Sequence, residues 1–400
     1  MNQKVTIGAM VDYISTAYWL PEFRSREGLR KWLGNCRDLG ITRLYFRVSN
    51  FGDFLHHTRL ERRISPGFED DPLDEDKKRA MSETCEMLRS FDILAAVTED
   101  AHHLGMEVVP WITLSDEGIP PENYTLFAGA HSEFLMQDRE GKRYDRSLSF
   151  GYPEVRKYRI ALIRELQEYG TDGVFLDFTR WLWKSHVQAR GCSLVDDKSA
   201  CLFGYDDPVI QDYREKTGRD PYEIPNGDTD WVRFRAEATN TRFLRELRLA
   251  LPGYPLYAYF LPRGFLSEML LDVPGWIKEG LVDALCPCAV TDVPQEGRIG
   301  RWTYALWNDF ARQFGQMVRA HRGTCRVGAP ILVSSSYGPH PDFVGAEPWS
   351  FLRPEIVEDV MLSAVRGGAD ELIFYDLCQE YNGERELWES LKPICRKALA

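Results

Sequence analysis

The sequence predicts a single (β/α)8 TIM barrel, in which eight parallel strands form a closed barrel inside a ring of helices. Short apolar runs alternate with longer amphipathic segments along the whole chain, which is the pattern of repeated βα units. Eight such units can be counted, and this number favours a closed barrel over an open sheet. The chain has 400 residues, 44% of them hydrophobic, so it can bury one large core. We therefore expect one domain over residues 1–400.

The expected strands are short apolar runs, several of them bounded by turn-forming residues. They lie at residues 5–10, 43–48, 107–112, 173–178, 256–260, 284–288, 326–333 and 371–375. The expected helices lie at residues 26–39, 91–104, 153–169, 231–251, 274–279, 304–321, 354–366 and 386–399. Glycine follows four of these helices, at Gly40, Gly105, Gly170 and Gly280, where a left-handed backbone commonly ends a helix.

Three of the expected βα loops are long, at about residues 49–90, 113–152 and 179–230, and we interpret them as insertions instead of separate domains. All three leave the C-terminal ends of strands, which is the face where a TIM barrel builds its active site. No G-x-G-x-x-G or G-x-x-x-x-G-K-[ST] motif follows the first strand, so nucleotide binding is not indicated.

The charge and composition of the chain indicate which classes of binding partner to expect. The formal net charge of −12 argues against a nucleic acid or an anionic membrane, because both would require a basic face. No apolar run is long enough to span a membrane, and the first ten residues lack a signal-like core, so we expect a cytoplasmic protein; a removed signal peptide would leave no trace. The nine cysteines are expected to be buried thiols, and we expect no metal and no cofactor.

The segment TDGVFLDFTRWLW, at residues 171–183, carries the strongest functional signal. Asp177 comes directly after the apolar run of the fourth expected strand, at the end where catalytic side chains of a barrel project. Arg180 follows three residues later, and Trp181 and Trp183 offer flat faces for a ligand ring. A structural ion pair between Asp177 and Arg180 is the main alternative interpretation.

Glycosidic bond cleavage requires two carboxyl groups on either side of the bond, and aromatic side chains bind the apolar faces of sugar rings. The other strand ends offer both kinds of residue. We expect the second carboxyl group to be Asp292, followed in rank by Glu296 and Asp376, with Glu117 behind them as a further acid at the mouth. The candidate substrate-binding residues at the strand ends are Arg47, His57, Trp111, Glu117, Arg180, Trp181, Trp183, Tyr259, Arg263 and His340.

Several blocks of the sequence resemble the glycosyl-hydrolase-like family ten proteins, a group of TIM-barrel glycosidases defined by sequence. The specific blocks are TDGVFLDFTR (171–180) and LLDVPGWIKEGLVDALCPCAVTD (270–292), and similar blocks lie at residues 102–114, 151–166 and 230–248. The resemblance runs from about residue 5 to residue 381. It implies a TIM barrel and glycoside hydrolase activity on an oligosaccharide or glycoside.

The sequence also departs from the family pattern. Phe178 stands where the family usually has Tyr, and Thr179 where it usually has Ile. At the sixth strand, Cys288-Ala289-Val290 replaces the more usual Met with a nearby Tyr, which implies a different sugar specificity.

The leading hypothesis is therefore a glycoside hydrolase with Asp177 as nucleophile or charge stabiliser and Asp292 as acid/base. A nucleophile on the fourth strand with an acid on the sixth is the arrangement of one large clan of retaining α-glycosidases, so we expect retention by analogy. Arg47, Arg180 and Arg263 together indicate an acidic or modified sugar. The alternatives are a non-catalytic carbohydrate-binding barrel and a metal-dependent barrel lyase or isomerase that uses His340.

Overall fold

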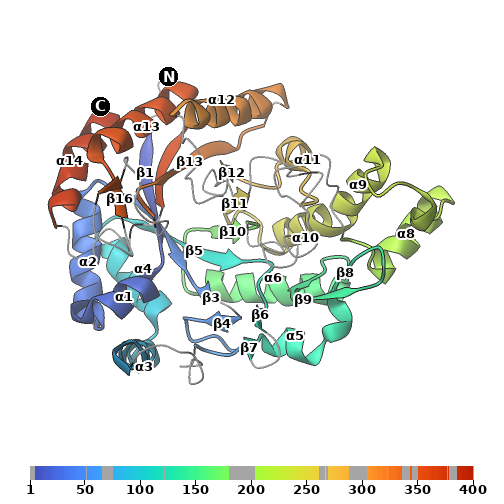
Figure 1. The fold of residues 1–400 in the computed structure, drawn as a ribbon, viewed down its shortest axis with the longest axis horizontal. Coiled ribbons are helices and arrows are strands. Elements are labelled where there is room, and N and C mark those ends of the chain that lie inside the picture. The colour runs from blue at the N-terminus through green and yellow to red at the C-terminus, as the bar shows by residue number, and fades with distance from the viewer. Residues whose placement is uncertain are drawn as a thin grey trace.

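The computed structural model describes residues 5–50, 52–64, 75–119, 123–179, 203–260, 266, 269–287, 304–321, 323–335, 343–344, 350–375, 377 and 385–399. Eight parallel strands close into a barrel, and helices surround it (Figure 1). Around the barrel the strands are β1 (Thr6–Val11), β2 (Arg43–Arg47), β5 (Glu107–Thr113), β10 (Val174–Asp177), β11 (Leu256–Phe260), β12 (Ala284–Pro287), β13 (Arg326–Leu332) and β17 (Glu371–Tyr375), which pairs with β1. The predicted TIM barrel is confirmed.

All eight predicted strands form, each within one residue of its expected ends. The helices are α1 (Tyr13–Trp19), α2 (Arg26–Asp38), α3 (Glu75–Ser90), α4 (Ile93–His103), α5 (Leu126–Ala130), α6 (Pro153–Glu168), α8 (Asp207–Thr217), α9 (Thr229–Ala236), α10 (Arg242–Ala250), α11 (Val273–Glu279), α12 (Tyr304–Ala320), α13 (Pro354–Gly367) and α14 (Arg385–Leu399). The predicted helix 231–251 is α9 and α10 joined by a π-helical turn, Glu237–Thr241. Helices α1, α3, α5 and α8 were not expected from the sequence.

Local sequence fixes where these helices begin and end. The Ser25 side chain accepts a hydrogen bond from the Gly28 backbone N–H at the start of α2, and Asp92 does the same for Leu94 and Ala95 at the start of α4. The four glycines predicted as helix stops have φ angles between 66° and 89°, the left-handed region in which a residue without Cβ carries no steric penalty.

The N-terminal end of the barrel interior is closed by a buried polar cluster. The Glu371 carboxylate accepts hydrogen bonds from Arg43 Nη1 at 2.6 Å and from the Tyr45 hydroxyl at 2.8 Å. Arg326 donates to the Tyr257 hydroxyl at 3.0 Å beside them. Burial raises the pKa of Glu371, and the Arg43 guanidinium works against that shift. Removing Arg43 would leave the buried Glu371 carboxylate without this ion-pair partner, whereas Arg43 also pairs with Glu107.

Aromatic side chains fill the middle of the barrel. The ring of Phe175 lies 4.5 Å from Tyr45 and stacks on Tyr259 at 5.1 Å, measured between ring centroids. Trp111 meets Phe175 edge-on at 6.4 Å. These inward-facing residues form a core cluster separate from the one between strands and helices, so the interior is packed and is not a pore.

The long loops carry small structures of their own. Among the described residues these include the hairpins β3 (Ser49–Asn50) with β4 (Asp53–Phe54), β6 (Gly118–Ile119) with β7 (Asn123–Tyr124), and β8 (Leu135–Gln137) with β9 (Arg143–Leu148), and the three-stranded sheet of β14 (Ser334–Ser335), β15 (Phe343–Val344) and β16 (Ser350–Leu352). Short 3-10 turns lie at Pro21–Phe23, Ser132–Phe134 and Pro221–Glu223. Helices α8 and α9 extend to one side of the barrel (Figure 1), around a small core that includes Tyr205, Tyr213 and Trp231.

Two composition-based expectations can be compared with the described part of the chain. Its five cysteines, Cys36, Cys85, Cys286, Cys325 and Cys395, are buried free thiols, as expected. None of the helices in the described ranges is long and apolar enough to cross a membrane.

The substitution Gly8→Ala in β1 tests how tightly the side chains of the polar cluster pack. A Cβ at this position would lie 2.6 Å from Glu371 Oε1 and 3.0 Å from the Tyr45 ring, so Gly8→Ala must displace the cluster. We expect Gly8→Ala to lower the free energy of unfolding by about 1–3 kcal/mol, measured by denaturant titration.

Gly34→Ala in α2 is the matched control, because a Cβ there meets nothing within 4 Å. It should leave stability unchanged or raise it by up to about 1 kcal/mol, since alanine favours a helix. Equal unfolding midpoints for Gly8→Ala and the parent protein would contradict the packing argument.

Candidate active site

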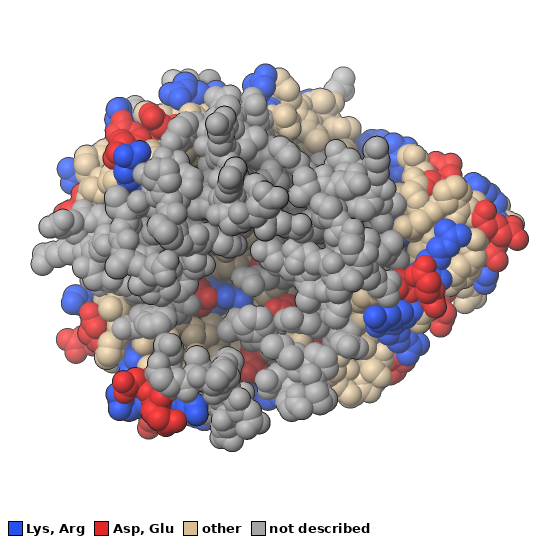
Figure 2. Space-filling model, in the orientation of Figure 1, with Lys and Arg blue, Asp and Glu red and all other residues tan. Residues whose placement is uncertain are grey.

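Five neighbouring strands contribute an arc of side chains at the C-terminal mouth of the barrel. Asp12 follows β1, Arg47 ends β2, Trp111 lies in β5, Asp177 ends β10 and Tyr259 lies in β11. Arg47 is the register partner of Trp111, and Asp177 is the partner of Tyr259. Acidic and basic side chains lie beside one another near the centre of the face seen in the space-filling view (Figure 2). The mouth is therefore lined by the kinds of residue that the sequence predicted.

Asp177 is fully buried and held by three hydrogen bonds. The Trp111 indole N–H donates to Oδ2 at 2.8 Å. The Thr179 backbone N–H and hydroxyl donate to Oδ1 at 2.7 and 2.6 Å. An ionised carboxylate has about four lone-pair positions, so these three contacts fix its orientation. Thr179 was not among the predicted site residues, although a Thr two residues after an Asp is a known local hydrogen-bonding pattern.

Arg47 and Asp12 form an ion pair beside the Trp111 ring. Arg47 Nη1 donates to Asp12 Oδ2 at 2.7 Å, and Nε donates to the Ser49 carbonyl oxygen at 3.0 Å. The guanidinium carbon lies 5.4 Å from the centre of the Trp111 ring, which suits a cation–π contact. Arg47 Nη2 is buried and has no hydrogen-bond partner among the described residues.

Polar contacts join the chain at the ends of β2, β5 and β10. Ser49 Oγ accepts a hydrogen bond from the Thr113 backbone N–H at 3.1 Å and lies 3.2 Å from the Thr113 hydroxyl. The Leu114 backbone N–H donates to the Asp177 carbonyl oxygen at 3.1 Å. Neither Ser49 nor Thr113 was predicted, because nothing in the local sequence distinguishes them from other polar residues at strand ends.

The predicted sugar platforms Trp111 and Tyr259 are each 2% exposed. Trp111 is placed between Phe175 and Arg47, and Tyr259 stacks on Phe175. These contacts are those of core residues. Stacking of a sugar on either ring stays a prediction.

Two predicted binding residues lie in structural networks. Glu117 is fully buried and forms an ion pair with Arg159 of α6, and it also accepts a hydrogen bond from the Thr125 hydroxyl at 2.9 Å. Burial lowers the pKa of Arg159 to about 10. A role for Glu117 in catalysis or binding would require this ion pair to open.

His57 lies on the segment that follows the β3–β4 hairpin, after β2. Its backbone N–H donates to the Asp92 carboxylate at 3.0 Å, and its ring Nδ1 lies 3.8 Å from the same carboxylate. Tyr169 donates to Asp92 at 2.7 Å. The structure therefore gives His57 contacts with the residues around α4 and α6, and its contact with substrate stays a prediction.

The remaining predicted site residues lie outside the described residues. These are the carboxylates Asp292, Glu296 and Asp376 and the binding candidates Arg180, Trp181, Trp183, Arg263 and His340. Within the described ranges, a group of side chains spaced for a metal is Glu99, Asp100 and His103 on α4. Asp100 there already pairs with Arg26 and Arg30, so this group is part of a helix-surface ion-pair network away from the mouth.

The architecture resembles that of solved glycoside hydrolases. The PgaB (BpsB) glycoside hydrolase domain of Bordetella bronchiseptica matches with a TM-score of 0.58 and 14% identity, covering 98% of this chain and 99% of that one. The β-amylase catalytic domain of Paenibacillus polymyxa matches with a TM-score of 0.57 and 11% identity, covering 99% of each chain. The β-galactosidase of Marinomonas ef1 matches with a TM-score of 0.57 and 12% identity, covering 98% of this chain and 59% of that one.

At such low identity the similarity establishes the fold and leaves the reaction open. No family model matches the sequence, and no curated protein matches it. Membership of the glycosyl-hydrolase-like family ten therefore stays a prediction from the motifs.

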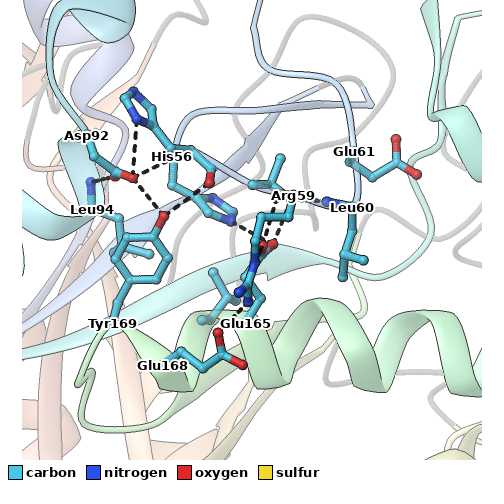
Figure 3. Close-up of polar contacts among 12 residues, drawn as sticks. His56, Arg59, Leu60, Glu61, Asp92, Leu94, Glu165, Glu168 and Tyr169 are labelled. Atoms are coloured by element: carbon cyan, nitrogen blue, oxygen red, sulfur yellow. Dashed lines mark hydrogen bonds and ion pairs between the residues drawn. The ribbon is translucent and has the colours of Figure 1, made fainter.

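Glu165 of α6 fixes the loop that follows β2, and its charge gives a pH test. Burial acts to raise its pKa, but contacts from His56, Thr58 and Arg59 outweigh burial and lower the pKa to about 2, below the ordinary 4.5 (Figure 3). A lowered pKa adds stability above about pH 4.5 that is lost as the pH falls towards about 2. Glu165→Gln should therefore be least stable relative to the parent near neutral pH, with the difference shrinking on acidification in thermal unfolding.

Glu168→Gln, one turn further along α6, is the matched control. Glu168 also pairs with Arg59, but its side chain is 53% exposed, so its removal should change stability little at any pH. A difference between Glu165→Gln and the parent that stays constant from neutral to acidic pH would contradict the assignment.

Proposed function

We propose that the protein is a glycoside hydrolase that uses Asp177 as the nucleophile. The observation that carries the proposal is the way Asp177 is held: a buried carboxylate at the end of the fourth barrel strand accepts three hydrogen bonds, all from uncharged donors. The barrel's similarity to solved glycoside hydrolase domains supports the same reaction class. The substrate class is an oligosaccharide or glycoside.

In the proposed reaction, an acid donates its proton to the glycosidic oxygen while the bond from C1 to that oxygen breaks. The Asp177 carboxylate attacks C1 and forms a glycosyl ester. The same acid, now a base, takes a proton from water, whose oxygen attacks C1 and releases Asp177. The acid is thereby restored to its protonated form, and the net change is hydrolysis with retention of configuration.

For the acid/base we propose Asp292, with Glu296 and Asp376 as the next candidates. Asp292 follows β12, the sixth barrel strand in chain order, five residues after that strand ends at Pro287. Strand ends of a parallel barrel meet at one mouth, so this position suits a carboxyl group that faces Asp177 across the substrate. The cytoplasmic location, the single-domain organisation and the lack of a nucleic-acid partner stay predictions from the sequence.

Asp177→Asn is the direct test. An amide cannot form the glycosyl ester, so we expect kcat on 4-nitrophenyl glycosides of both anomeric forms to fall on the order of 10³-fold or more. Sodium azide added to Asp177→Ala should restore turnover and give a glycosyl azide of inverted configuration, because azide then attacks C1 from the vacated face.

Asp292→Ala is the partner experiment. It should retain activity on a dinitrophenyl glycoside, whose leaving group needs no protonation, and azide should give a glycosyl azide of retained configuration. Undiminished hydrolysis by Asp177→Asn would overturn the proposal. Sugar binding without hydrolysis in the parent, unchanged in Asp177→Asn, would instead identify a carbohydrate-binding barrel.

Trp111→Phe tests whether the indole N–H positions Asp177. The ring is kept and one hydrogen bond to a charged group is lost, so kcat should fall about 10- to 100-fold with little change in KM. Trp32→Phe in α2 is the matched control, because the Trp32 indole nitrogen is buried without a hydrogen-bond partner. An equal effect of both changes on kcat would mean that Trp111 acts through packing alone.

A further inference from the structure

Arg47 has a donor that the described contacts leave unused. Two of its three nitrogens are occupied, Nη1 by Asp12 and Nε by the Ser49 carbonyl oxygen. Nη2 is buried and has no hydrogen-bond partner, and the side chain as a whole is only 7% exposed. A buried donor without an acceptor is costly and rare in folded proteins. Its presence at the mouth indicates a position prepared for a ligand oxygen.

The unused donor belongs to a side chain that shares a neighbour with Asp177. The two side chains contact the same indole: Asp177 accepts from its N–H, and the Arg47 guanidinium lies against its ring. They belong to β2 and β10, which flank β5 in the barrel. A sugar ring whose C1 faces Asp177 would therefore come within reach of Arg47.

The charge of the pair restricts what Arg47 can bind. Asp12 neutralises Arg47 at 2.7 Å, and the Asp12 side chain is only 13% exposed, so its charge is weakly screened by solvent. A carboxylate on the ligand would be attracted by Arg47 and repelled by Asp12 next to it, and it would lose its hydration on entering. A hydroxyl oxygen accepts one N–H and brings no charge.

We propose that Arg47 Nη2 binds a hydroxyl group of an uncharged sugar ring, so that the glycone of the substrate is neutral. This inference rests on the proposed function, since it places that ring in the same site. It differs from the acidic sugar that the sequence predicted from three arginines. Of those three, Arg47 is already paired with Asp12, and Arg180 and Arg263 lie outside the described residues.

The test compares the parent with Arg47→Lys. Lysine keeps the positive charge next to Asp12 but lacks the planar group that presents Nη2. The probes are 4-nitrophenyl hexosides, the corresponding uronides, and deoxy hexosides that each lack one hydroxyl. The parent should hydrolyse the best hexoside at least tenfold faster than its uronide, measured as kcat/KM. Removal of one particular hydroxyl from the substrate should lower kcat/KM of the parent about 10- to 100-fold. The same removal should lower kcat/KM of Arg47→Lys far less.

Arg248→Lys is the matched control. Arg248 also pairs with an aspartate, Asp283, at 2.7 Å, but Asp283 precedes β12 and so lies at the opposite end of the barrel. This variant should show the same pattern across the deoxy hexosides as the parent. The inference would be overturned if the parent preferred uronides. It would also be overturned if each missing hydroxyl lowered kcat/KM equally in the parent and in Arg47→Lys. Either result would leave the hydrolase function standing.

A binding measurement separates the two proposals. The affinity of Asp177→Asn for the same hexosides and uronides can be measured by calorimetry, with and without the additional change Arg47→Lys. If the parent hydrolyses no glycoside but binding of a hexoside depends on Arg47 and on one hydroxyl, the hydrolase proposal fails and the Arg47 site stands. If no hexoside binds and none is hydrolysed, both fail.

Discussion

The structure depends on one constraint: in each parallel strand every second side chain points into a closed interior with room for only a few large groups. On β10, Phe175 and Asp177 are two residues apart, so both side chains point towards the barrel interior. Phe175 fills the centre against Tyr45 and Tyr259, and Asp177 lies beyond it at the mouth. A shift of one residue in register would exchange Asp177 for Leu176. Aromatic packing in the middle of the barrel therefore fixes the position of the catalytic candidate.

At the mouth, two charged side chains have a partner from a neighbouring strand. Trp111 of β5 holds Asp177 of β10, and Asp12 after β1 holds Arg47 of β2. Outside the barrel, Glu165 accepts hydrogen bonds from the Thr58 hydroxyl and the Arg59 backbone at 2.6 and 2.8 Å, which fixes the loop that continues from β2 (Figure 3). Side chains with such support lose little conformational freedom when a ligand binds.

The sequence was sufficient for the barrel because each strand is a short apolar run, a signal contained in the strand itself. It was insufficient for the pairing of polar residues, because the partners lie far apart along the chain. Trp111 and Asp177 are 66 residues apart, and Glu117 and Arg159 are 42 apart. The local sequence therefore shows neither that Trp111 donates to Asp177 nor that Glu117 pairs with Arg159. Helix α3 was missed for a different reason: its sequence is mostly charged and polar, with few apolar positions to show a helical period.

Two buried carboxylates among the described residues of the barrel differ in the groups that hold them. Glu371, at the N-terminal end, lies 2.6 Å from the Arg43 guanidinium, so its charge is cancelled by a full positive charge. The three hydrogen bonds to Asp177 come from an indole N–H, a hydroxyl and a backbone N–H, all uncharged. Among the described residues, these donors orient the carboxylate and bring no positive charge of their own. Because an oxocarbenium-like transition state is stabilised by a nearby negative charge, this setting suits the role proposed for Asp177 at the C-terminal mouth.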